Sequence, residues 1–165
     1  FTMNTGTIRT AVPADLDAIT ALEAVCFPPA EAAAREEFAA RLAVYPTHFW
    51  LLEDAGRLVS CINGMATDEE TIRDELFADA SLHREQGAWQ AIFGVVTLPE
   101  YRGRGCAAQL MERVIRDARA QGRRGCILTC KQKLIHYYEK FGYYNGGISQ
   151  SVHGGAVWYD MRLEF

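Results

Sequence analysis

The sequence is short of the features that mark several large classes of protein. Lys and Arg number 17 against 21 Asp and Glu, a formal net charge of −4, whereas a general nucleic-acid binder needs a basic surface. No apolar run approaches the roughly 18 residues that cross a bilayer, so no membrane partner is expected. No repeat and no Ser/Pro-rich linker interrupts the 165 residues, which therefore fit one domain, 1–165, with a sizeable core.

Paired cysteines are missing as well. The five cysteines are an odd number and none forms a C-x-x-C pair, so we expect reduced thiols, without disulfides and without a metal site. The opening residues FTMNTG contain no charged region followed by an apolar one, so no secretion signal is visible. The expected location is the cytoplasm.

Apolar periodicity and turn residues predict a chain that mixes strands and helices. Strands are expected at 7–12, 48–54, 57–67, 89–98, 125–130 and 156–165, and helices at 13–27, 31–45, 106–121 and 131–143. Ala55-Gly56 predicts a hairpin between the second and third strands. The strand-loop-helix-strand succession over 89–130 makes its two strands parallel. The expected class is α/β, in the α+β sense, with a mixed sheet packed between helices.

The stretch YRGRGCAAQL, 101–110, places two arginines and two glycines between an apolar strand and a helix. The free N–H groups and the dipole of a helix start favour an anion, and glycine lets a phosphate approach the backbone. Arg102 and Arg104 add positive charge at the rim. The stretch has neither the Lys-Ser/Thr ending of a nucleoside-triphosphate loop nor the third glycine of G-x-G-x-x-G. Taken alone, it also reads as an exposed Arg-Gly turn.

The surroundings of this loop favour the phosphate reading. RGRGCA, 102–107, matches R/Q-x-x-G-x-G/A and resembles the acetyl-coenzyme A signature of the GCN5-related N-acetyltransferase (GNAT) superfamily. The opening RTAVPADLDAITALEAVCF is similar to the first strand and helix of that superfamily, and LTCKQKLIHYYEKFGYYNGG is similar to its late helix. The resemblance covers nearly the whole chain and implies a GNAT-like fold, a central mixed sheet of about 6–7 strands flanked by about 4 helices.

A narrower likeness points to the arylalkylamine (serotonin) N-acetyltransferase branch. It is carried by CFPP, by RLVSCINGMATDEETIRDELFADASLHREQG and by LTCK with LIHYYEKFGY. The resemblance implies direct transfer of an acetyl group from acetyl-CoA to a small primary amine, arylalkylamine- or polyamine-like, in a ternary complex without a metal. The main chain of Val95, Val96 and Thr97 would then pair with the pantetheine arm like an added strand. The residues expected around the pyrophosphate are Arg102, Gly103, Arg104, Gly105, Cys106, Ala107 and Ala108.

The same resemblance assigns Tyr138 as the general acid that protonates the departing thiolate. A phenol with a pKa near ~10 suits an alkyl thiolate of similar basicity. Leu134 and Phe141 share its helical face, so an ordinary core tyrosine is the alternative. Cys130 is a weaker candidate for catalysis, because no Cys-His-Asp arrangement accompanies it and a buried cysteine is usually a small hydrophobe.

The general base has no clear candidate in the sequence. Ala91 and Phe93 occupy the positions at which the animal arylalkylamine enzymes carry two histidines. A chain of ordered waters could serve instead. The side chains considered for this role are Asp68, Glu69, His83 and His136.

The acceptor region is expected around an acidic segment and several aromatic side chains. Residues 68–79 hold six acids against one arginine, which would attract a cationic amine or would form an ordinary solvated loop. Phe27-Pro28-Pro29, Phe77 and Trp89 would supply an aromatic wall. These features favour a small amine over a protein tail.

Two other functions stay open at this point. Ala91 and Phe93 also suit a non-catalytic acyl-CoA-binding regulatory module that has lost its base. Acetylation of a protein N-terminus or lysine is the other alternative. The residues demand neither a monomer nor a homodimer, although the last strand could pair across a dimer.

Overall fold

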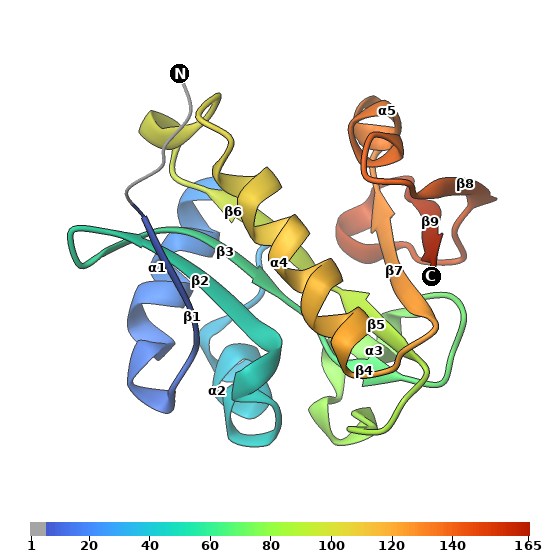
Figure 1. Cartoon of the computed structure of the whole chain (residues 1–165), viewed down its shortest axis with the longest axis horizontal. Helices are drawn as coiled ribbons and strands as arrows, with labels where there is room; N and C mark the ends of the chain where they lie inside the picture. The colour runs from blue at the N-terminus through green and yellow to red at the C-terminus, as the bar shows by residue number, and fades with distance from the viewer. Residues whose placement is uncertain (1–5) are drawn as a thin grey trace. The chain divides into compact units, whose positions relative to one another are not determined.

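The computed structural model describes residues 6–165, in which nine strands and five α-helices are present (Figure 1). The strands are β1 (Thr7–Thr10), β2 (Phe49–Asp54), β3 (Arg57–Asn63), β4 (Ala66–Thr67), β5 (Trp89–Ile92), β6 (Gly94–Thr97), β7 (Gly125–Cys130), β8 (Tyr144–Ile148) and β9 (Tyr159–Glu164). The helices are α1 (Leu16–Cys26), α2 (Arg35–Val44), α3 (Asp74–Ala78), α4 (Cys106–Ala120) and α5 (Ile135–Glu139). Part of the N-terminal segment used to judge a secretion signal lies outside the described residues.

The described chain divides into two compact units, each with its own sheet. The first unit contains the residues up to Asn63 together with Gly94–Val114. The second unit contains Gly64–Phe93 together with Ile115–Phe165. That 1–165 forms a single domain stays a prediction.

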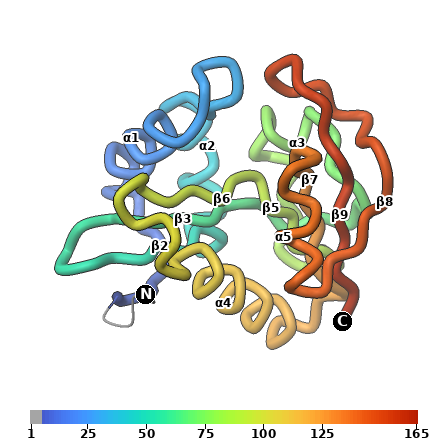
Figure 2. The backbone as a smooth tube through the Cα atoms, turned by 90° about the horizontal axis from the view of Figure 1, so that it is seen from above, coloured from blue at the N-terminus to red at the C-terminus, as the bar shows by residue number. Residues whose placement is uncertain are grey.

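The first unit is built on an antiparallel sheet with the order β1-β2-β3-β6. The predicted hairpin between β2 and β3 is confirmed, and both of its turn residues, Ala55 and Gly56, have positive φ (51° and 81°), as tight hairpin turns require. Figure 2 shows α1 and α2 on one side of this sheet and the N-terminal half of α4 on the other. The apolar residues of the strands are therefore covered on both faces.

The second unit is built on a mixed sheet with the order β4-β5-β7-β9-β8. β5 and β7 are parallel, as predicted, and the other neighbouring strands are antiparallel. α5 packs against β8 and β9. The turn that follows α5 contains Gly142, whose φ is 102°. β8 was not predicted, because its sequence YNGGI lacks the alternation of a half-buried strand.

The predicted strand 89–98 breaks at Phe93, and its two halves, β5 and β6, belong to different sheets. The expected α/β class, in the α+β sense, is confirmed, and the strands of residues 6–165 form two sheets, of four and five strands, with five α-helices. Gly94 follows the break and permits close packing, because a Cβ there would lie 3.2 Å from Nδ2 of Asn63 and 3.5 Å from Oε1 of Glu23.

The remaining predicted elements are confirmed with shorter boundaries. The expected helices 13–27 and 131–143 each begin with a 3-10 turn, Pro13–Asp15 and Gln132–Leu134, before the α-helix starts. The expected strand 57–67 is interrupted after Asn63, so that Arg57–Asn63 forms β3 and Ala66–Thr67 forms β4. Within residues 6–165, no helix has both the length and the apolar character needed to cross a bilayer.

Candidate functional site

The loop between β6 and α4 has the backbone conformation that a phosphate cradle needs. After the 3-10 turn Pro99–Tyr101, the chain passes through Gly103 with φ 79° and Gly105 with φ 76° before α4 begins at Cys106. Residues with a Cβ rarely adopt this left-handed region. A Cβ on Gly103 would meet nothing within 4 Å, so the backbone conformation, and not crowding, favours glycine there.

Tyr101 fixes the position of this loop in the first unit. Its hydroxyl donates to Oδ2 of Asp54 over 2.7 Å, and the guanidinium of Arg104 lies 4.9 Å from the centre of its ring. Sγ of Cys106 donates to the Tyr101 carbonyl over 3.7 Å. The hydrogen bond to Asp54 is the main cause of the raised pKa of Tyr101, which keeps the hydroxyl in its donating form.

Arg102 folds back toward the strand that precedes the loop. Its Nε donates to the Thr97 carbonyl over 3.2 Å, while the side chain stays on the surface. The same carbonyl accepts from Sγ of Cys26 over 3.3 Å. The structure thus brings the two predicted cofactor segments, 95–97 and 102–108, into direct contact within one unit.

Within the described part of the chain, β6 is an edge strand of its sheet, since β3 is its one neighbour there. An edge strand offers main-chain groups to an added strand or an extended ligand. Val96 is buried, whereas Val95 and Thr97 are half-buried. The Thr97 carbonyl accepts from Arg102 and Cys26, and the Val96 carbonyl accepts from the Ser60 hydroxyl over 2.8 Å, so Val95 is the better position of the three for pairing with a pantetheine arm. Their role stays a prediction.

The first turn of α4 forms the other half of the predicted phosphate cradle. Backbone N–H groups of a first helical turn have no acceptor within the helix. Cys106 is buried and anchors this turn, and burial raises the pKa of its thiol, so the thiol stays protonated at neutral pH. Ala107 and Ala108 are half-buried and small, which leaves the helix start open to a large anion.

Tyr138 lies on α5 in the second unit and is 6% exposed. Its ring makes edge contacts with Tyr137 and Tyr143, at centre distances of 5.1 and 6.0 Å. Burial is the main cause of its raised pKa, so the phenol stays protonated well above neutral pH. Among residues 6–165, no hydrogen-bond partner is found for its hydroxyl, and the hydroxyl oxygen is not fully enclosed.

The candidate bases have structural partners. Oε1 of Glu69 lies 2.6 Å from Nε of Arg73. Nδ1 of His83 accepts the Ala66 N–H over 3.1 Å, and its Nε2 lies 2.9 Å from Oε1 of Glu85. With Nδ1 accepting, the proton of His83 sits on Nε2, and neither nitrogen is available to a substrate.

Two further candidates are equally unsuited to a base. Oδ1 of Asp68 accepts the Ala88 N–H over 3.0 Å, which closes a loop. The His136 side chain is 87% exposed and lies 3.5 Å from Glu139, as expected for a surface helix. The base stays unassigned.

The structure gathers an aromatic cluster in the second unit that the sequence indicated only in part. The ring of Phe77 lies 4.8 Å from that of Phe93 and stacks on that of His153 at 5.2 Å. His153 in turn lies 6.2 Å from Trp158. Phe93 therefore takes part in an aromatic surface. Ala91, the other position at which the animal arylalkylamine enzymes carry a histidine, is fully buried.

Trp89 was predicted to line the acceptor region, and this prediction is wrong. It is 1% exposed, with the guanidinium groups of Arg124 and Arg162 at 5.3 and 5.5 Å from its ring. Two cations lie over the ring and strand neighbours cover the rest, so no ligand reaches it. Trp89 is a core residue of β5.

The acidic segment 68–79 is mainly structural. Asp74 accepts the Ser151 hydroxyl and the Val152 N–H, the second over 3.1 Å, and so ties α3 to the segment between β8 and β9. Asp79 accepts from the backbone and hydroxyl of Ser81 over 3.0 and 2.6 Å. The field of these acids is partly compensated by their partners, which weakens the argument from charge alone.

Cys130 does not act as a nucleophile in this arrangement. It is buried at the end of β7, and burial raises the pKa of its thiol to about 11. The thiolate, which is the nucleophilic form, is therefore scarce at neutral pH. None of the five cysteines forms a disulfide within residues 6–165.

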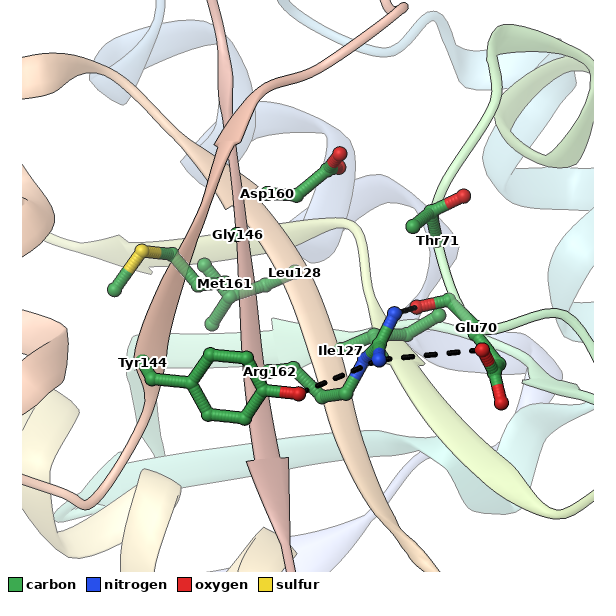
Figure 3. A pocket seen from close by; sticks show the side chains of 9 residues that line it. All are labelled: Glu70, Thr71, Ile127, Leu128, Tyr144, Gly146, Asp160, Met161 and Arg162. Carbon is green, nitrogen blue, oxygen red and sulfur yellow. Dashed lines mark hydrogen bonds and ion pairs between the residues drawn. The ribbon is translucent and has the colours of Figure 1, made fainter.

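Sequence reasoning missed a pocket of about 270 Å³ in the second unit. Its lining includes Asp160 and Arg162 of β9, Tyr144 of β8 and Glu70 of the acidic segment (Figure 3). The alternation of YDMRLE could have shown that Asp160 and Arg162 share one face of a strand. Nothing local could have shown which residues lie opposite them.

Known proteins resemble this chain in sequence and in fold. The model of the Acetyltransferase (GNAT) family matches residues 16–143. The GphF GNAT-like decarboxylase in complex with isobutyryl-CoA has a similar structure, with a TM-score of 0.82, 23% identity and coverage of 96% of this chain and 98% of that chain.

Two other solved structures are similar over nearly the whole chain. The loading GNATL domain of CurA from Lyngbya majuscula has a TM-score of 0.83 and 17% identity, with 98% of each chain covered. The ribosomal-protein-S18-alanine N-acetyltransferase from Escherichia coli has a TM-score of 0.72 and 17% identity, with 96% of this chain and 93% of that chain covered. At such identities the likeness establishes the fold, which is GNAT-like.

Proposed function

This chain belongs to the acetyltransferase (GNAT) family and is an acetyl-CoA-dependent enzyme, and from this premise we propose its acceptor and its catalytic residues. The acceptor is a small primary amine, arylalkylamine- or polyamine-like, as in the arylalkylamine N-acetyltransferase branch. The acetyl group passes directly from the thioester to the amine in a ternary complex. No metal takes part.

One observation carries the cofactor assignment: an edge strand runs into a loop with two left-handed glycines, and this loop starts a helix. In this arrangement the main chain of Val95, Val96 and Thr97 runs beside an extended pantetheine arm and pairs with it like an added strand. The N–H groups of 103–108 surround a diphosphate, and Arg102 and Arg104 add positive charge. The residues present therefore fit acetyl-CoA.

Tyr138 acts as the general acid in this proposal. Bound acetyl-CoA supplies the acyl thioester, and the amine nitrogen attacks its carbonyl carbon as the bond to sulfur breaks. The nitrogen then loses its extra proton to water, and a proton from solvent restores the phenol that has protonated the thiolate. The thiolate that leaves needs a proton, and the Tyr138 hydroxyl is protonated and has no hydrogen-bond partner in residues 6–165. A donor kept ready in this way suits general acid catalysis.

The ammonium of the acceptor loses its proton to water. The side chains considered as bases have structural partners or lie on an exposed helix surface. Water needs no dedicated side chain, and a neutral amine is the nucleophile in either case. The rate should then follow the fraction of neutral amine.

The aromatic cluster of Phe77, Phe93, His153 and Trp158 supports an acceptor with an apolar or aromatic body. Aromatic faces bind both rings and alkylammonium groups. The likeness to a ribosomal-protein N-acetyltransferase keeps a peptide acceptor as the alternative. The likeness to a GNAT-like decarboxylase is the reason to test a carboxylated acyl-CoA beside acetyl-CoA.

The test is release of free coenzyme A thiol from acetyl-CoA with a panel of acceptors. The panel contains arylalkylamines, polyamines and short peptides with free N-termini, and malonyl-CoA replaces acetyl-CoA in a parallel set. Turnover with the small amines and not with the peptides supports the proposal. Acetyl-CoA binding without turnover on any acceptor supports the non-catalytic module instead, and turnover on peptides alone overturns the choice of acceptor.

A further inference from the structure

The pocket in the second unit is lined by charged and apolar groups, and its one guanidinium, that of Arg162, is paired with Glu70 (Figure 3). Its volume of about 270 Å³ is just below the range of about 300–1,000 Å³ that holds drug-sized ligands. Its lining residues are Glu70, Thr71, Ile127, Leu128, Tyr144, Gly146, Asp160, Met161 and Arg162. A ligand that fits it is smaller than a typical drug and has both polar and apolar parts.

The Arg162 side chain is held in the wall of the pocket by partners from the protein. Its Nη2 donates to the Glu70 carbonyl over 2.8 Å and its Nη1 to the Tyr144 hydroxyl over 3.3 Å. The carboxylates of Glu70 and Glu164 each lie 4.0 Å from Nη1. The charge of this guanidinium is therefore balanced by the protein, and it does not call for an anionic ligand.

Asp160 has one carboxylate oxygen that lacks a donor. Its Oδ1 is enclosed and has no hydrogen-bond partner, and Figure 3 shows its carboxylate apart from the linked group of Arg162, Tyr144 and Glu70. Burial raises the pKa of this carboxyl, although a hydrogen bond with Ser149 and the charge of Arg162 act in the opposite direction. A buried acceptor without a donor is costly, and a ligand that supplies the donor removes that cost.

The ligand can be specified further from the charges and shapes around Asp160. Two carboxylates, Glu70 and Asp160, and one guanidinium line the pocket, so the balance favours a cation. The Tyr144 ring and Ile127 supply apolar surface for a hydrocarbon or aromatic body. One carboxylate oxygen with a single missing donor suits an ammonium better than a metal ion, which needs several oxygen ligands.

We propose that this pocket binds a small primary ammonium compound with an aromatic or alkyl body, whose ammonium donates to Asp160. The binding is a property of the second unit. That the bound amine is also the acetyl acceptor is a further step, and this step rests on the function proposed above.

The experiment measures binding by calorimetry at pH 7.5 without acetyl-CoA. The probes are tyramine and 4-ethylphenol, which share the ring and differ in the ammonium. We expect tyramine to bind at least about tenfold more tightly, since hydrogen bonds to charged groups contribute that much. Asp160→Asn should remove this preference. Glu75→Gln, which removes one exposed charge from the same unit outside the pocket, should change the affinity less than about twofold.

Gly146→Leu provides a second test that keeps the carboxylate. A Cβ at position 146 would lie 3.5 Å from Cβ of Asp160, an ordinary contact, and the rest of the leucine would occupy space beside it. We expect this variant to lose tyramine binding at least about tenfold, and it decides the case if Asp160→Asn fails to fold. Equal affinities for the two probes, or tyramine binding that survives both substitutions, would overturn the proposal.

The same variants separate this proposal from the proposed function. Thiol release is measured with tyramine as acceptor. Binding that depends on Asp160 without turnover keeps the pocket and refutes the transfer to this amine. Turnover that Asp160→Asn leaves unchanged, with no Asp160-dependent binding, refutes the pocket and keeps the enzyme.

Discussion

Tyr138→Phe separates a catalytic tyrosine from an ordinary core tyrosine. The substitution removes one hydroxyl and keeps the ring, whose edge contacts with Tyr137 and Tyr143 hold it in place. In residues 6–165 this hydroxyl has no hydrogen-bond partner. Removing it therefore leaves no protein donor or acceptor unsatisfied, and the free energy of unfolding should change by less than about 0.5 kcal/mol.

The effect on catalysis should be much larger than the effect on stability. General acids contribute about 10²–10⁴-fold, so kcat should fall by at least about a hundredfold, equivalent to ~3 kcal/mol of transition-state stabilisation. The affinity for acetyl-CoA should stay within about twofold, because the cradle is formed by other residues. The assay combines steady-state thiol release, calorimetry with coenzyme A and a thermal melt.

The pH profile gives a further readout of the same group. Burial raises the pKa of Tyr138 above its ordinary value, so the acid is protonated through the neutral range and is lost only in strongly alkaline solution. The wild type should show no fall in kcat from this group below pH ~10. Tyr138→Phe should be slow at every pH.

Tyr137→Phe is the matched control, since it removes a neighbouring hydroxyl from the same helix. Tyr137 is half-buried, and burial also raises its pKa. This variant should retain kcat within about twofold. Equal losses in the two variants, or full activity of Tyr138→Phe, would refute the assignment of the general acid.

Three further predictions concern the cradle and the pocket. Gly105→Ala forces a Cβ into a backbone with φ 76°, so it should cost about 1–2 kcal/mol, lower Tm by several degrees and weaken coenzyme A binding in calorimetry. Arg102→Glu together with Arg104→Glu should weaken coenzyme A binding at least about tenfold at low salt, and less at high salt because screening reduces the loss; unchanged binding at low salt would refute the cradle. The pKa of Asp160 is raised in the folded state, so protonation of this carboxyl stabilises the fold. In urea titrations the wild type should therefore lose stability relative to Asp160→Asn as the pH rises from 4 to 7. A stability difference that does not change with pH would contradict this prediction.

Much of the cradle was predictable from the sequence, because its determinants are local. The glycines of RGRGCA stand between an apolar strand and an amphipathic helix, and both are in the left-handed region that glycine favours. The β2–β3 hairpin followed from Ala55-Gly56 for the same reason. Residues a few positions apart in sequence determine such turns, so no distant contact is needed to predict them.

The partners of a strand were not predictable in this way. The apolar run 89–98 indicated burial on both faces, which is correct for β5, whereas Val95 and Thr97 of β6 are only half-buried. Which strand each half pairs with depends on residues far away in sequence: β5 pairs with β7, whereas β6 pairs with β3. A continuous run of apolar residues has the same sequence pattern whether it lies in one sheet or is divided between two.

The sequence by itself indicated the family and the turn conformation of the loop before α4, and the assignment of that loop to the cofactor and of Tyr138 to the general acid stays a prediction. Only the tertiary structure placed Trp89 under two guanidinium groups and brought Glu70, Tyr144 and Asp160 around one pocket. The reason is that a motif records the conformation of consecutive residues. The exposure and the charge balance of a side chain depend instead on neighbours that the fold brings from distant parts of the chain.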